Sequence, residues 1–172
     1  MKKILYDCDP GIDDGIAIIL AINSEKIKIE AITTVFGNSP VEKTTLNACR
    51  LLDYLGQDIE VCAGAKKPLN ELDTKFSEGK VDASSVDIHG KDGLGDSSLL
   101  TKTSSRKLVN KLAYKFIIEK VKQGIDTIVA TGPLTNIALA FKENPEIMNK
   151  LRELIIMGGV INQEGNIGRL AE

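Results

Sequence analysis

Residues 7–22, DCDPGIDDGIAIILAI, place four carboxylates within eight positions, directly before an apolar run without charge. Residues 4–6 (ILY) are apolar and Pro10-Gly11 supplies a turn within the cluster, which predicts a buried strand ending at Asp7 and a helix starting near Asp13 and Asp14. Because this helix is apolar on all sides, we expect it to be buried. The acidic cluster therefore falls at the carboxyl end of a strand.

Strand and helix patterns alternate along the rest of the chain. Further strands are predicted at 27–35, 59–62, 127–132 and 153–159, and helices at 41–55, 108–124 and 134–141. This alternation predicts an α/β fold with a mainly parallel central sheet and helices on both faces, formed as a single domain over residues 1–172. Residues 64–104 show no sustained period.

Polar or unusual residues follow four of the five predicted strands. Asp7 and Asp9 follow the first, Asn38 the second, Thr131 the fourth and Met157 the fifth. Parallel α/β sheets bind their ligands outside the carboxyl ends of the strands. We therefore expect one crevice to collect these residues.

Composition excludes several classes of function. The net charge of -2 and the absence of Trp and of a basic stripe exclude nucleic acid as a partner. The longest apolar run is too short to cross a bilayer, and Asp7 interrupts the N-terminal segment before a signal peptide could form. Cys8, Cys49 and Cys62 lack zinc-site spacing, so we expect reduced, buried thiols and a cytoplasmic location.

The clustered carboxylates need compensation. Two like charges about 4 Å apart repel by roughly 4 kcal/mol at an effective dielectric near 20. One acid could cap the helix and another could shape the turn, but a single cap needs only one acid. A hard divalent cation such as calcium or magnesium suits the remaining carboxylates.

Five motifs stand out in order along the chain: DCDPGIDDGIAIILA at 7–21, VFGN at 35–38, ATGPLTNIA at 130–138, IIMGG at 155–159 and EGN at 164–166. Together they resemble the nucleoside hydrolases, specifically the inosine/uridine-preferring, calcium-dependent ribohydrolases that split ribonucleosides into ribose and base. The resemblance extends over the whole chain.

The resemblance implies a role for each matching residue. Asp9 and Asp14 would bind calcium through their carboxylates and Thr131 through its backbone carbonyl, and Asp9 would also be the general base for a calcium-bound water. Asp7 would stabilise these ligands without binding the calcium itself. The substrate contacts would be Asp13, Asn38, Asn166 and Glu172 at ribose hydroxyls, Met157 at the sugar and His89 near the base.

The implied chemistry suits these residue types. Cleavage of an N-glycosidic bond passes through an oxocarbenium-like sugar, which requires an activated water, negative surroundings and firm hydrogen bonds to the ribose. A metal lowers the pKa of water and a nearby carboxylate takes the proton. The acidic segment would then serve as both metal site and cation stabiliser.

The chain also departs from the family. Members are longer, and one further calcium-ligating Asp, with a neighbouring His, lies in the part that has no match here. Gly168-Arg169 stands where many relatives carry Thr-Pro. We expect a chain truncated at its C-terminus that forms a homo-oligomer or pairs with a partner chain covering the missing half.

Other interpretations remain open at the level of sequence. Asp-Cys-Asp also suits a magnesium-dependent phosphohydrolase of the haloacid dehalogenase type, with Asp7 as nucleophile. A truncated, non-catalytic domain that binds a metal or a ribonucleoside is a third possibility. Taken singly, Asn38 and Asn166 could be turn residues, Thr131 a strand end, Met157 a core residue, and His89 and Glu172 solvated side chains.

Overall fold

Five parallel strands form one sheet in the order β3-β2-β1-β4-β5 in the computed structural model, which describes residues 1–69, 88–100, 103–160 and 162. The strands are β1 (Lys2–Cys8), β2 (Ile27–Thr34), β3 (Glu60–Ala63), β4 (Thr127–Ala130) and β5 (Glu153–Ile156). The helices are α1 (Ile12–Ile22), α2 (Val41–Tyr54), α4 (Ala113–Lys122), α5 (Thr135–Glu143) and α6 (Pro145–Met148).

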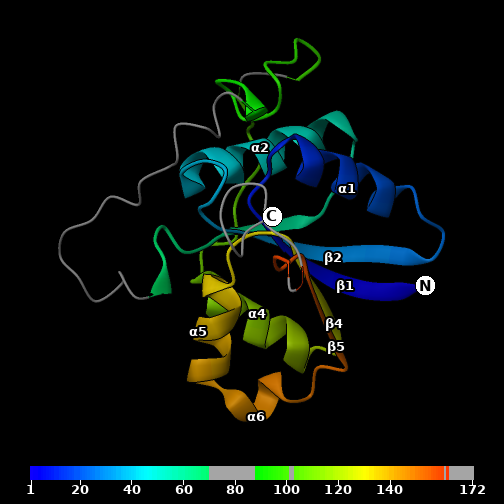
Figure 1. Ribbon diagram of the computed structural model, residues 1–172. Helices are drawn as coiled ribbons and strands as arrows, with labels where there is room; N and C mark the ends of the chain where they lie inside the picture. Colours follow the sequence, from blue (N-terminus) through cyan, green and yellow to red (C-terminus); the bar gives the residue numbers. More distant parts are fainter. Residues whose placement is uncertain (70–87, 101–102, 161, 163–172) are drawn as a thin grey trace.

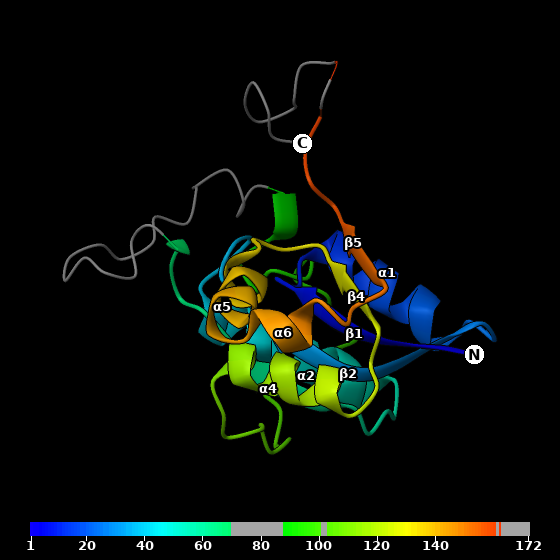
Figure 2. The same cartoon turned by 90° about the horizontal axis from the view of Figure 1, so that it is seen from below.

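Helices cover both faces of the sheet. In Figure 1, α1 and α2 lie on one face, and α4, α5 and α6 lie on the other; Figure 2 views the molecule from the side of the second group. Alternate residues of β1 serve the two layers, because Ile4 and Tyr6 pack with Ile18 of α1, whereas Leu5 packs with Phe116 of α4. The predicted fold class is confirmed.

The central strand determines where the polar residues lie. β1 pairs with β2 on one side and β4 on the other, and all three strands run in the same direction. Their carboxyl ends therefore share one edge of the sheet. Asp7 opposes Thr33 and Ala130 in this register, which places the start of the acidic segment between the ends of the two neighbouring strands.

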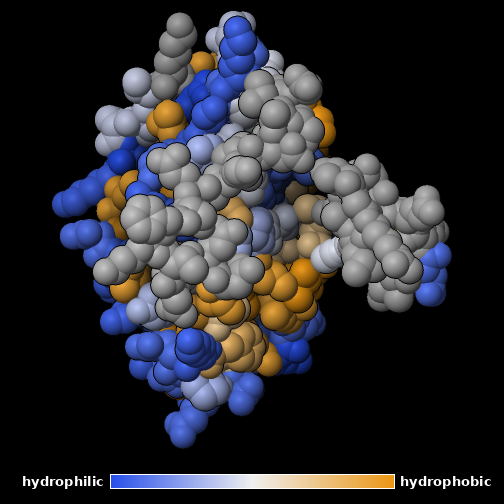
Figure 3. Space-filling model, turned by 60° about the vertical axis from the view of Figure 1, so that its left-hand side comes forward, coloured by the Kyte–Doolittle hydropathy of each residue, from blue (hydrophilic) through white to orange (hydrophobic). Residues whose placement is uncertain are grey.

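The expectation that α1 is buried on all sides is wrong. Its buried residues are Asp14, Gly15 and Ile18, whereas the side chains of Ile16 and Leu20 are 54% and 67% exposed. A helix lying on a sheet buries one stripe, and among the described helices and strands α1 packs mainly against β2. Figure 3 presents a different face of the molecule, on which hydrophobic residues also gather at the surface, at and below the centre of the view.

The predicted long helix over 108–124 is also shorter than expected. α4 begins at Ala113, and the chain before it is extended beside β3, where Val109 N–H donates to the Val61 carbonyl at 2.9 Å. Arg106 fixes the same segment by donating to the carbonyls of Gln57 and Ile59. Hydrogen bonds to the free edge of β3 hold this segment extended, although the spacing of its apolar residues favours a helix. Gly124, at φ +101°, ends the helix as predicted.

Two further sequence predictions concern cysteines and membranes. Cys8, Cys49 and Cys62 are free and buried, as expected. Across the described residues, no helix combines the length and the apolar character needed to span a membrane.

Candidate functional site

Asp7 is the innermost carboxylate at the end of β1. It is fully buried, and its Oδ1 accepts hydrogen bonds from Thr33 Oγ1 at 2.5 Å and Asn136 Nδ2 at 2.9 Å. Its Oδ2 is buried without a hydrogen-bond partner among the described residues. Burial raises the pKa of this carboxyl to about 6, against the opposing effect of the two hydrogen bonds.

Asp9 lies where the loop after β2 turns towards β1. Asn38 N–H donates to Asp9 Oδ2 at 2.7 Å, and the Asn38 side-chain amide donates to the Asp9 carbonyl at 3.1 Å. Gly37 allows this approach, because a Cβ at that position would lie 2.0 Å from Asp9 Oδ2. A Cβ at Gly132 would similarly lie 2.8 Å from Oδ1. The carboxylate is therefore enclosed by backbone from two loops.

Asp14 lies in the first turn of α1 and faces Asp9 across the same space. Its Oδ2 accepts from Gly11 N–H at 3.3 Å, which caps the helix, and from Asn38 Nδ2 at 3.4 Å. Its Oδ1 accepts from the Thr131 hydroxyl and, at 3.4 Å, from Tyr6 OH. Residues from three strand ends thus converge on this one carboxylate.

The pKa values of both carboxylates are raised. Burial is the main cause that raises the pKa of Asp9 to about 8, and the negative charge of Asp14 adds to it. Burial also raises the pKa of Asp14, although the hydrogen bonds from Thr131 and Gly11 favour its ionised form. The charged neighbours that act on Asp9 are themselves acids, Asp14 and Asp13. Ionising both groups therefore calls for a cation.

Asp13 and His89 form the outer rim of this site. The Asp13 carboxylate is exposed, and its Oδ1 lies 4.0 Å from His89 Nδ1. The His89 ring is buried and accepts the Ile12 N–H through Nδ1 at 3.2 Å. Gly11 lies beneath the ring, since a Cβ there would be 2.8 Å from two of its atoms. The structure thus brings His89 to the acidic segment from 77 residues away.

The remaining predicted residues are not brought into this cluster. Met157 follows β5, two strands from β1, and its side chain is 42% exposed. Its backbone N–H donates to the Ala130 carbonyl at 2.8 Å, so the residue does follow the carboxyl end of a strand. Asn166 and Glu172 lie outside the described residues.

The donor set has the chemistry of a hard-cation site. Asp9 and Asp14 supply buried carboxylate oxygens, and the unpaired Oδ2 of Asp7 lies in the same acidic segment. Over residues 1–69, 88–100, 103–160 and 162, no three His, Cys, Asp or Glu side chains form a complete metal-binding group. The residues therefore fit such an ion as part of a ligand set that needs further oxygen ligands.

Sequence reasoning missed several residues of the site. The Tyr6 hydroxyl lies 3.0 Å from the Thr131 hydroxyl, within hydrogen-bond distance, and burial raises the pKa of this phenol. Asn136 connects Asp7 to the Thr34 carbonyl. Asn136 lies in the segment 130–138 and Tyr6 directly precedes the segment 7–21, so their places beside recognised motifs were a usable signal. The partners come from other strands, however, and only the fold shows them.

Comparison with known proteins identifies the family to which this chain belongs. The sequence model described as "Inosine-uridine preferring nucleoside hydrolase" matches residues 4–172. The chain belongs to this family. It is 39% identical over 174 residues to uridine nucleosidase 1 of Arabidopsis thaliana and 39% identical over 175 residues to the inosine-uridine preferring nucleoside hydrolase of Leishmania major, with 99% of this chain covered in both cases.

The structural likeness agrees with the family. A purine-preferring ribonucleoside hydrolase from Gardnerella vaginalis matches 98% of the chain with a TM-score of 0.88 and 34% identity. The match covers 52% of that protein, and the Arabidopsis and Leishmania relatives are covered over 49% and 52% of their lengths. This chain thus spans about half the length of the relatives it matches.

Proposed function

We propose that this chain takes part in the hydrolysis of the N-glycosidic bond of ribonucleosides, which releases ribose and free base. One observation carries the proposal. Asp9 and Asp14 are buried at the carboxyl end of the central strand, and Asn38 donates hydrogen bonds to both. Membership of the nucleoside hydrolase family supports the same chemistry.

The names of the relatives support ribonucleosides as the substrate class. Their names specify uridine, inosine and uridine, or purine ribonucleosides, so the base varies among them. Ribose is common to these substrates. We accordingly assign the ribose to the side chains beside the aspartates, Asp13 and Asn38, and place the base near His89; Met157, Asn166 and Glu172 remain proposed sugar contacts.

The side chains of this site suit an oxocarbenium-like sugar. Asp9 and Asp14 would place negative charge next to the carbon that becomes positive, and their enclosure by backbone limits competing solvation. Asp9 is the proposed general base, since its Oδ2 is fixed by Asn38 and burial favours the protonated product of that step. Asp7 would hold the segment through Thr33 and Asn136.

Calcium is the proposed cofactor. Asp9 and Asp14 would hold it through their carboxylates and Thr131 through its backbone carbonyl, with Thr131 also orienting Asp14 by its hydroxyl. When bound, the ion supplies activation of a water molecule and compensates the clustered negative charge.

The alternative of a phosphohydrolase with Asp7 as nucleophile is not favoured. Asp7 is completely buried and its Oδ1 is occupied by two donors, so it does not offer an accessible attacking oxygen. The family match points to glycoside chemistry instead.

Assembly and location are also part of the proposal. The exposed Ile16 and Leu20 of α1 support self-association or a partner chain. The buried free cysteines support a cytoplasmic location. Sedimentation of the purified chain distinguishes a monomer from an oligomer.

Ribose release tests the proposed reaction. The 172-residue chain is assayed with inosine and uridine in the presence of calcium, beside Asp9→Asn and the control Asp58→Asn, which changes an exposed acid. We expect release by the wild-type chain and the control, and a loss of at least about 100-fold in Asp9→Asn. Equal release by Asp9→Asn would refute its assignment as base.

A further inference from the structure

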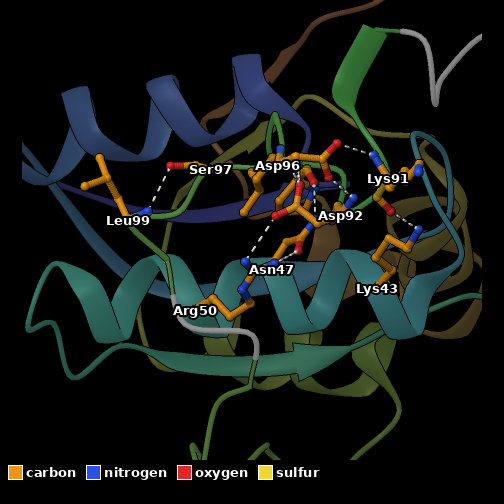
Figure 4. Close-up of polar contacts among 10 residues, drawn as sticks. Lys43, Asn47, Arg50, Lys91, Asp92, Asp96, Ser97 and Leu99 are labelled. Carbon is orange, nitrogen blue, oxygen red and sulfur yellow. Dashed lines mark hydrogen bonds and ion pairs between the residues drawn. The ribbon is translucent and has the colours of Figure 1, made fainter.

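Residues 88–96, here called the histidine loop, are fixed by their own hydrogen bonds. Asp92 Oδ1 accepts from Leu94 N–H at 2.8 Å and from Asp96 N–H at 2.9 Å. The Asp96 carboxylate accepts in return from Lys91 N–H and Asp92 N–H at 3.1 and 2.9 Å. Figure 4 shows these reciprocal contacts above α2. The loop that carries His89 is therefore a compact unit.

Two side chains of α2 attach this unit to the rest of the molecule. Arg50 is buried and donates to Asp92 Oδ2 at 3.1 Å, with a second donor on Asn47 Oδ1 at 3.2 Å. Asn47 is also buried, and its amide donates to the Asp92 carbonyl at 3.0 Å and to the Pro10 carbonyl at 3.2 Å. Asn47 thus bridges the histidine loop and the acidic segment directly. Figure 4 shows its side chain pointing from α2 towards Asp92.

The attachment determines which ring nitrogen of His89 carries the proton. A neutral imidazole has one donor and one acceptor nitrogen. Nδ1 accepts the Ile12 N–H at 3.2 Å, so the proton of the neutral ring resides on Nε2. If the histidine loop moved away from α2, this constraint on the tautomer would be lost.

We propose that Asn47 and Arg50 are positioning residues, which hold the histidine loop against the acidic segment so that His89 keeps its Nε2–H tautomer. This inference deepens the proposed function, on which it rests, since Nε2–H becomes the donor that His89 offers to a ribonucleoside. Neither α2 residue needs to touch the substrate for this role. Arg50 acts through Asp92, and Asn47 through two backbone carbonyls.

The first test is the tautomer in the wild-type chain. His89 is the only histidine in the sequence, so its ring nitrogens give unambiguous ¹⁵N resonances without further assignment. Spectra are recorded at about pH 8, where an ordinary histidine is neutral. We expect a protonated Nε2 and an acceptor Nδ1. A predominantly Nδ1-protonated ring would overturn the proposal.

The second test removes the attachment. In Arg50→Met we expect a mixture of tautomers and about tenfold faster hydrogen exchange at the Ile12 amide, as for loss of one hydrogen bond of typical strength. Arg50→Lys should restore most of the wild-type pattern. The matched control is Arg106→Met, which removes a second, half-buried arginine whose partners lie at Asp53, Gln57 and Ile59. It should leave the His89 spectrum unchanged.

If Arg50→Met fails to fold, Asp92→Asn tests the same contact between Arg50 and Asp92 with little change in side-chain shape. This variant should also give a mixture of His89 tautomers. A folded Arg50→Met or Asp92→Asn with the wild-type spectrum would overturn the proposal. These readouts need neither substrate nor calcium, so absence of ribonucleoside hydrolysis would leave them intact and would count against the proposed function alone.

Discussion

At its N-terminus, α1 meets buried carboxylates, whereas the outer face of the same helix exposes isoleucine and leucine side chains. Asp9 and Asp14 are almost fully buried, while Ile16 and Leu20 are more than half exposed. Globular proteins usually show the opposite arrangement. Burial at the strand end is therefore imposed by the sheet topology and not by polarity, and the charge of these acids is removed by bound protons or, as we propose, compensated by a cation.

The largest expected effect is the pH dependence of stability in the metal-free chain. Burial raises the folded-state pKa of Asp9 from 3.8 to about 8 and that of Asp7 to about 6. Between these values and the unfolded pKa, the folded chain binds more protons at these two groups, so their contribution to the free energy of unfolding is greatest below about pH 4 and falls as pH rises towards 8. We expect a fall of several kcal/mol in urea titrations.

Two comparisons sharpen this pH prediction. Asp9→Asn removes the ionisation with the largest shift, so its stability should vary less with pH. Saturating calcium should likewise flatten the profile of the wild-type chain, because the ion favours the ionised carboxylates. Stability that rises with pH between 4 and 8 in the metal-free protein would contradict the assigned environment of these acids.

The next largest effect is expected at Gly37. Its φ is +155°, and a Cβ there would lie 2.0 Å from Asp9 Oδ2, so Gly37→Ala must displace the loop or the carboxylate. We expect a loss of about 3 kcal/mol in the free energy of unfolding, measured by chemical denaturation.

Gly56→Ala provides the control for backbone strain alone. Gly56 follows α2 at φ +62°, and a Cβ there would have no neighbour within 4 Å. Gly56→Ala should lower the free energy of unfolding by about 1 kcal/mol, with or without calcium. If Gly37→Ala and Gly56→Ala lowered the free energy of unfolding equally, the close approach of Gly37 to Asp9 would not matter for stability.

The smallest effect is expected on the outer face of α1. Ile16→Ser and Leu20→Ser should change the free energy of unfolding by no more than about 0.5 kcal/mol, because both side chains are exposed. Ile18→Ala, on the buried side of the same helix, should cost about 3 kcal/mol. Denaturation of the three variants measures both values. A large cost for Leu20→Ser would show that the outer face is covered in solution.

The sequence predicted those features that depend on local patterns. Alternating strands and helices gave the parallel sheet, and the position of Asp9 and Asn38 after two of its strands placed them at one edge. The Pro-Gly turn and the acids beyond it correctly predicted the start of α1.

Features that depend on distant partners could not be predicted. The segment before Ala113 has helical spacing, but its backbone pairs with β3. Asn47 contacts a loop 45 residues away, and nothing in the pattern of α2 distinguishes it from a surface residue. The exposure of Leu20 likewise depends on what packs outside the helix, which composition does not encode.

We propose that the buried carboxylates form part of a calcium site, and calorimetric titration of calcium into the metal-stripped chain measures this binding. We expect saturable binding with release of protons, weakened at least about tenfold in Asp14→Asn and unchanged in Asp58→Asn. Proton release is measured by repeating the titration in buffers of different ionisation enthalpy. Absence of calcium binding, or equal binding by Asp14→Asn, would refute the assignment of these carboxylates as calcium ligands.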